Sequence, residues 1–165
     1  MAVGPIVLIG FMGVGKTSVG RAIASALGQS FLDLDEAIQL AHGPINHLFS
    51  AHGELHFRAL ECAALANALT SNLGVIATGG GIVTYPESLQ LLKGCSQVVW
   101  LRAPLALVEE RIQADAQTNR PLADTNLGTR FHHRQPLYSD CATTCIDIHR
   151  QSIEEIAQKI INGYR

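Results

Sequence analysis

Short apolar runs alternate along the chain with longer stretches in which apolar residues recur every three or four positions. The short runs predict strands buried in a parallel sheet, and the periodic stretches predict helices. Because strand and helix alternate, the pattern predicts an α/β fold with a parallel sheet. The predicted strands are 5–10, 30–34, 74–78, 97–101 and 142–148, and the predicted helices are 16–27, 35–72 with breaks near Gly43–Pro44 and Gly53, 86–92, 104–114, 128–135 and 152–162.

The periodicity is lost over residues 115–126, which read DAQTNRPLADTN. This segment is polar and contains proline and asparagine. Long loops within a compact domain are often lids over a ligand site. We therefore expect a lid in this part of the chain.

Composition is typical of a globular protein with one domain. The chain has 165 residues, of which 47% are apolar and 16% charged, so it is too apolar for a disordered chain and long enough to bury a core. Twelve basic and fourteen acidic residues give a net charge of −2, which argues against a nucleic-acid-binding surface. No uncharged apolar stretch reaches about 18 residues, so no membrane-spanning helix is expected.

The cysteines favour a cytoplasmic protein. They form neither a C-x-x-C pair nor a regular framework, which indicates free thiols in a reducing compartment. The apolar N-terminus lacks the basic residues of a secretory signal, in agreement with that expectation. The four cysteines are Cys62, Cys95, Cys141 and Cys145.

The strongest chemical signal is G-F-M-G-V-G-K-T at residues 10–17, between a predicted strand and a predicted helix. It fits the G-x-x-x-x-G-K-[ST] pattern, in which glycines let backbone N–H groups face phosphate oxygens at a helix N-terminus. The lysine would reach the β- and γ-phosphates of a nucleotide, and the threonine hydroxyl would bind Mg²⁺. The alternative is a glycine-rich turn without a ligand. The predicted nucleotide-binding residues are Gly13, Val14, Gly15, Lys16, Thr17 and Ser18.

Two acids, Asp33 and Asp35, stand at the end of the second predicted strand in F-L-D-L-D. Residues two apart on a strand share a face, and ligands of open α/β sheets bind beyond the carboxyl ends of the strands. One carboxylate could hold Mg²⁺ through water, and the other could accept a proton from a substrate hydroxyl. The alternative is a helix N-cap beside a solvated acid.

Arg58 is the one basic residue between Arg21 and Lys93, and it lies on the same predicted helix face as Glu54 and Glu61. The acids could orient this arginine toward a substrate carboxylate, or the three could form a surface ladder of ion pairs. Three other features are candidates for ligand contact. Gly79, Gly80 and Gly81 follow a predicted strand and permit close backbone approach, Arg120 lies in the expected lid, and Arg134 is a second candidate for binding a carboxylate.

Taken together, the motifs resemble those of the shikimate kinase family, in that family's order, from Gly10 to about Arg150. They are G-F-M-G-V-G-K-T, F-L-D-L-D, G-E-L-H-F-R-A-L-E, V-I-A-T-G-G-G, R-P-L and R-Q-P-L-Y. The resemblance implies a nucleoside-monophosphate-kinase-like, three-layer α/β/α fold with a five-stranded parallel sheet. It also implies one kinase domain over 1–165, with a substrate-binding segment at about 33–61 and a lid at about 112–126.

The family's reaction, which the resemblance implies here, transfers the γ-phosphate of ATP to the 3-hydroxyl of shikimate. The products are shikimate 3-phosphate and ADP, and the pathway leads to chorismate and the aromatic amino acids. Carried over by position, Asp35 would hold the reacting hydroxyl, and Arg58 and Arg134 would hold the carboxylate with the backbone of Gly79–Gly81. Lys16 and Arg120 would act on the phosphates, Thr17 and Asp33 would serve Mg²⁺, and Arg150 would lie near the adenine.

The sequence departs from the family's pattern without losing a group that has a chemical role. His47 stands where an acid is usual, and the lid reads R-P-L-A where R-P-L-L is usual. The expected partners are therefore ATP and a small anionic hydroxy acid, bound by a monomer. Two alternatives remain open, namely a kinase of another hydroxy acid such as gluconate and a non-catalytic nucleotide-binding module.

Overall fold

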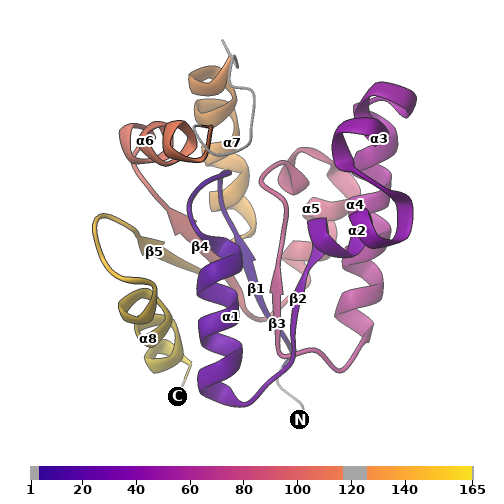
Figure 1. Cartoon of the computed structure of the whole chain (residues 1–165). Coiled ribbons are helices and arrows are strands. Elements are labelled where there is room, and N and C mark those ends of the chain that lie inside the picture. Colours follow the sequence, from indigo (N-terminus) through magenta and orange to yellow (C-terminus); the bar gives the residue numbers. More distant parts are fainter. Residues whose placement is uncertain (1–3, 117–125, 165) are drawn as a thin grey trace.

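The computed structural model describes residues 4–116 and 126–164, and its centre is a five-stranded parallel sheet (Figure 1). The strand order is β2-β3-β1-β4-β5, and every neighbouring pair is parallel. All carboxyl ends therefore lie along one edge, which confirms the predicted fold class. The strands are β1 (Ile6–Ile9), β2 (Phe31–Asp33), β3 (Val75–Ala77), β4 (Val98–Arg102) and β5 (Thr144–Asp147).

Helices cover both faces of this sheet. Figure 1 shows α1 and α8 packed together on one face, whereas α5 and α7 cover the other. The helical stretch predicted over 35–72 is broken at Gly43 and Gly53, whose φ values of 92° and 83° favour glycine. The helices are α1 (Lys16–Leu27), α2 (Leu34–His42), α3 (Ile45–His52), α4 (Glu54–Thr70), the 3₁₀ helix η1 (Ile82–Thr84), α5 (Pro86–Lys93), α6 (Leu105–Ala116), α7 (Leu127–Cys141) and α8 (Ile153–Gly163).

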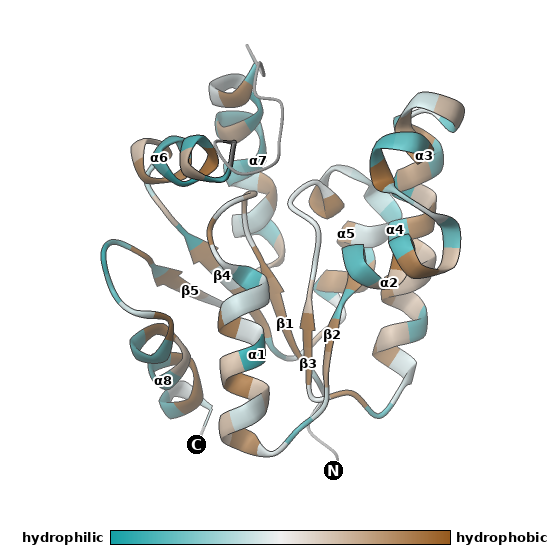
Figure 2. Cartoon of the chain, in the orientation of Figure 1, coloured by the Kyte–Doolittle hydropathy of each residue, from teal (hydrophilic) through white to brown (hydrophobic). Residues whose placement is uncertain are grey.

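The apolar runs of the sequence form the centre of the core. Every residue of β1 is buried, and so are the apolar residues of β3 and β4, which Figure 2 shows as hydrophobic ribbon between the helices. Strands buried on both faces need apolar side chains at every position, which explains why these runs do not alternate. In the described part of the chain, no helix is long and apolar enough to cross a membrane.

The predicted end of one helix is wrong by a full turn or more. The helix expected over 128–135 extends over Leu127–Cys141 and continues past Pro136, so that β5 begins at Thr144. A proline inside a helix removes one backbone hydrogen bond and normally favours a break. Here the turn beyond the proline buries Tyr138 completely and Cys141 almost so, and this packing outweighs the local preference.

Close packing of α1 on the sheet depends on Gly20. A Cβ atom at this position would lie 2.5 Å from Cε2 of Phe31 and 3.2 Å from Cδ1 of Leu8. Gly20→Ala should therefore lower the free energy of unfolding by about 1–3 kcal/mol, although alanine has the higher helix propensity. Urea unfolding monitored by circular dichroism measures this change. Gly163→Ala is the matched control, because no atom of the described residues lies within 4 Å of that Cβ position. Equal stabilities of the two variants would contradict the explanation.

Candidate active site

The phosphate loop joins β1 to α1 at the carboxyl edge of the sheet. Gly13 and Gly15 have φ values of 77° and 96°, and Gly15 is the N-cap residue of α1. Residues other than glycine rarely adopt these backbone angles. The glycines of the motif therefore permit the tight backbone curve that turns N–H groups toward the inside of the loop. Val14 is buried beneath the loop, whereas Ser18 is exposed in the first turn of the helix.

Lys16 is buried and held back inside this loop. Its Nζ donates hydrogen bonds to the carbonyl oxygens of Gly10 (2.8 Å) and Phe11 (2.9 Å). Burial lowers the pKa of Lys16 to about 8, against the opposing effect of the nearby carboxylates of Asp35 and Asp33. The loop therefore contains a cation whose two partners are neutral carbonyl groups that phosphate oxygens can replace.

Asp33 has two structural partners. Its Oδ1 accepts hydrogen bonds from the backbone N–H groups of Asp35 (2.9 Å) and Glu36 (3.1 Å), so it caps α2. Its Oδ2 accepts a hydrogen bond of 2.5 Å from the hydroxyl of Thr17. The prediction that Asp33 and Asp35 share a strand face is wrong, because β2 ends at Asp33 and Asp35 lies in the first turn of α2. Capping accounts for one oxygen of Asp33 only, and the other faces the phosphate loop.

Arg58 is buried on α4, so the arrangement is not a surface ladder of ion pairs. Its Nη1 pairs with Oε2 of Glu61, and its Nη2 lies 3.1 Å from Oε1 of Glu54. The guanidinium also lies over the rings of Phe49 (5.9 Å) and Phe57 (5.4 Å). These contacts fix the plane of the guanidinium. The spacing of the acids predicted that they share a helix face with Arg58, and left open whether they orient it or form a surface ladder.

The Gly79–Gly81 turn packs directly against these charged groups. A Cβ atom at Gly79 would overlap Oε1 of Glu61 and lie 2.9 Å from Oδ1 of Asp35, and a Cβ atom at Gly81 would overlap the guanidinium of Arg58. At Gly80 it would lie 3.0 Å from the backbone nitrogen of Met12 in the phosphate loop. None of the three has a positive φ. Lack of space, and not backbone strain, therefore requires glycine at these positions.

Arg134 approaches the same place from α7. It is buried, its guanidinium lies 5.5 Å from the centroid of the Phe11 ring, and burial lowers its pKa. Unlike Arg58, it has no carboxylate within ion-pair distance in the described part of the chain. A buried cation without an acidic partner is costly, and an anionic ligand would complete it.

The remaining predicted residues lie apart from this cluster or outside the described residues. Arg150 is exposed in the loop between β5 and α8, and Arg120, with most of the expected lid, lies outside the described residues. Sequence reasoning missed two contacts. Arg111 of α6 donates from Nη1 to the carbonyl oxygen of Val14 (3.0 Å), and Tyr138 donates to that of Gly80 (2.5 Å). The one signal in the sequence for a role of Tyr138 was that it follows Arg134 by four residues, a spacing that places both on the same helix face.

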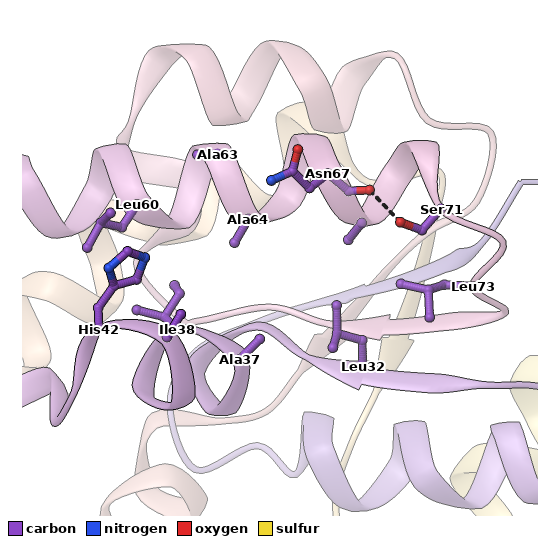
Figure 3. A pocket seen from close by; sticks show the side chains of 12 residues that line it. Leu32, Ala37, Ile38, His42, Leu60, Ala63, Ala64, Asn67, Ser71 and Leu73 are labelled. Carbon is purple, nitrogen blue, oxygen red and sulfur yellow. Dashed lines mark hydrogen bonds between the residues drawn. The ribbon is translucent and has the colours of Figure 1, made fainter.

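A separate cavity of about 310 Å³ lies between α2 and α4 (Figure 3). Its lining is largely apolar and includes Ile38, Leu60 and Ala64. Among its lining residues, His42 is the one with a titratable side chain. This cavity therefore lacks the charged groups that the cluster around Lys16 provides.

Glu61 gives the site a pH-dependent stability. Burial raises its pKa from 4.5 to about 7, although Arg58 opposes the shift. Between these values the folded protein binds more protons than the unfolded chain, so stability falls as the pH rises. From pH 5 to pH 8 this contribution to the free energy of unfolding should fall by about 2 kcal/mol. Denaturant unfolding across this range measures it, with Glu61→Gln as the non-titrating reference. Parallel pH profiles for the two proteins would contradict the shift.

Comparison with known proteins agrees with this geometry. The family model described as "Shikimate kinase" matches residues 12–165. A shikimate kinase of Enterococcus faecalis is 41% identical over 161 residues, covering 94% of this chain and 95% of the relative, and one of Thermodesulfovibrio yellowstonii is 41% identical over 165 residues, covering 96% and 94%.

Solved structures give the same result. "Shikimate kinase from Acinetobacter baumannii in complex with shikimate" superimposes with a TM-score of 0.89 at 35% identity, covering 99% of this chain and 93% of that one. A gluconokinase from Sinorhizobium meliloti, with a TM-score of 0.70, 24% identity and coverage of 97% and 90%, shares the fold alone. The sequence motifs, the site geometry and these matches lead to one conclusion: the chain belongs to the shikimate kinase family.

Proposed function

We propose that this chain transfers the γ-phosphate of ATP to the 3-hydroxyl of shikimate, giving shikimate 3-phosphate and ADP. The observation that carries this proposal is the position of two buried arginines, Arg58 and Arg134, around the glycine turn that touches the phosphate loop. A carboxylate is the small anion that a pair of guanidinium groups matches best. The acceptor's acid group would therefore be bound next to the phosphate that is transferred.

Asp35 would provide the base. Its carboxylate contributes to the electrostatic environment of Lys16, so a hydroxyl between them faces both an acid and the phosphate loop. The hydroxyl oxygen attacks the γ-phosphorus, its proton passes to Asp35, and the bond between the γ-phosphorus and the bridging oxygen of ADP breaks. Lys16 would exchange the carbonyl oxygens of Gly10 and Phe11 for phosphate oxygens and stabilise the charge in transfer.

Mg²⁺ is part of the proposal, and the residues present fit it. The Thr17 hydroxyl and Oδ2 of Asp33, which are hydrogen-bonded to each other, are hard oxygen donors beside the phosphate loop. These two residues would hold the ion, directly or through water, and a bound Mg²⁺ would neutralise charge on the β- and γ-phosphates.

The wider setting follows from the same proposal. The kinase would be a single domain over 1–165, with the acceptor segment at about 33–61 and a lid at about 112–126 whose Arg120 closes over ATP. Arg150 would lie near the adenine. The protein would be a cytoplasmic monomer, and the free thiols of its four cysteines are in keeping with a reducing compartment.

The first experiment measures ADP release from ATP and Mg²⁺ with shikimate, quinate, gluconate or a nucleoside monophosphate as the acceptor. We expect turnover with shikimate to exceed that with each other acceptor. Turnover on gluconate alone would make the chain a kinase of another hydroxy acid. ATP binding without turnover on any acceptor would instead favour a non-catalytic nucleotide-binding module.

The two arginines should respond differently to the same substitution. Arg134→Met removes a buried charge that has no acidic partner among the described residues, so it should raise the KM for shikimate by about 10- to 100-fold without lowering the melting temperature. Arg58→Met should raise this KM similarly but also destabilise the fold, because it leaves Glu61 buried without its cation. Steady-state kinetics and calorimetry test both. An unchanged KM for shikimate in Arg134→Met would exclude its carboxylate role.

A further inference from the structure

The three carbonyl groups of the Gly79–Gly81 turn are each held by a hydrogen bond. The Gly79 carbonyl accepts from the backbone N–H of Ile82 (3.3 Å), and the Gly81 carbonyl accepts from the N–H (3.0 Å) and the hydroxyl (2.6 Å) of Thr84. These donors belong to η1, which directly follows the turn. The Gly80 carbonyl accepts instead from the Tyr138 hydroxyl at 2.5 Å. Of the donors to these carbonyls within the described residues, Tyr138 alone comes from a distant part of the chain.

This hydrogen bond also fixes the direction of an N–H group. A trans peptide is planar, so the N–H of Gly81 points opposite to the carbonyl of Gly80. Holding that carbonyl against α7 therefore directs the Gly81 N–H away from Tyr138. Within the described part of the chain, none of the three glycine N–H groups donates to a protein acceptor. They are available to a ligand, and the position of Gly81 against Arg58 places its N–H beside the proposed carboxylate site.

Tyr138 is held rigidly enough to impose this orientation. It is completely buried, and its ring packs against Trp100 with the centroids 5.8 Å apart. Burial raises the pKa of the hydroxyl above its ordinary value, so at neutral pH it keeps its proton and acts as a donor. It also follows Arg134 by four residues on α7, so both side chains project from the same face of one helix.

We propose that Tyr138 is a positioning residue for the acceptor. By holding the Gly80 carbonyl, it directs the Gly81 N–H toward shikimate, the ligand that Arg134 also binds. This inference rests on the proposed function. It extends the acceptor site to a buried side chain that does not itself touch the substrate. Its consequence is that the helix carrying one carboxylate-binding arginine also sets the orientation of the backbone donors.

The kinetic test compares Tyr138→Phe with Tyr164→Phe in the full-length protein. The control removes another buried hydroxyl, one that makes no hydrogen bond within the described part of the chain. Tyr138→Phe should raise the KM for shikimate about fivefold or more, while the KM for ATP and kcat stay within about twofold. Tyr164→Phe should leave all three unchanged. A general loss of packing would not give this split between the two substrates.

Nuclear magnetic resonance tests the orientation directly. The sequence contains two Gly-Gly peptides, 79–80 and 80–81. In protein labelled with [1-¹³C,¹⁵N]glycine, an HNCO spectrum therefore shows two signals, those of the Gly80 and Gly81 amides. In the free protein, Tyr138→Phe should shift the carbonyl carbon of Gly80, which appears in the signal of the Gly81 amide. Tyr164→Phe should shift neither of the two signals. In the wild type, shikimate should shift the Gly81 amide.

The outcomes separate this proposal from the function on which it rests. If the wild type does not phosphorylate shikimate, the proposed function fails and this inference fails with it. If the wild type is active and folded Tyr138→Phe keeps the wild-type KM for shikimate, the positioning role alone is overturned. If Tyr138→Phe does not fold, the wild-type spectrum decides. The proposal is overturned if neither Gly-Gly signal of the wild type shifts when shikimate is added.

Discussion

The close approach of the Gly79–Gly81 turn to its neighbours is the constraint on which the rest of the site depends. The turn touches Arg58 and Glu61 on one side and the phosphate loop on the other, at distances that leave no room for a side chain. Arg58 and Glu61, the charged groups that the turn touches, are themselves buried. Charges in such surroundings interact more strongly than on the surface, and unpaired ones cost more. The same packing that creates the site therefore also makes its charge balance critical.

The two buried arginines meet this requirement in different ways. Arg58 is neutralised within the protein by Glu61 and Glu54 and is enclosed by two phenylalanine rings, so it stays ordered without a ligand. Arg134 has a ring beneath it but no carboxylate partner in the described residues. One cation is preorganised, while the other needs an anion to compensate its burial. A carboxylate that contacts both arginines would gain more binding free energy from Arg134 than from a solvated arginine. Until such a ligand binds, the unpaired buried charge lowers the stability of the folded protein.

Much of this arrangement can be predicted from the sequence, where local spacing and chemistry agree. The phosphate loop, the breaks at Gly43 and Gly53 and the acids around Arg58 follow from residue type and helical or turn geometry. The predictions that failed had two different causes. Tertiary packing, the burial of Tyr138, carries α7 past Pro136. A local interaction, the capping of α2 by Asp33, starts that helix one residue before Asp35. The contacts of Tyr138 and Arg111 join segments far apart in the chain, which spacing alone cannot place together.

Phe11 connects the two substrate sites through one residue. Its carbonyl oxygen accepts from Lys16, which the nucleotide would recruit, and its ring lies under Arg134, which the acceptor would recruit. The ring is further fixed by an edge-on contact with Phe131 at 5.3 Å, so it cannot move independently of α7. If phosphate draws Lys16 away, the Phe11 carbonyl would lose its donor, and a carboxylate bound to Arg134 would act on the ring of the same residue. Binding of ATP and binding of the acceptor would then be coupled through Phe11, and such a coupling would be reciprocal, because each ligand would change the affinity for the other by the same factor.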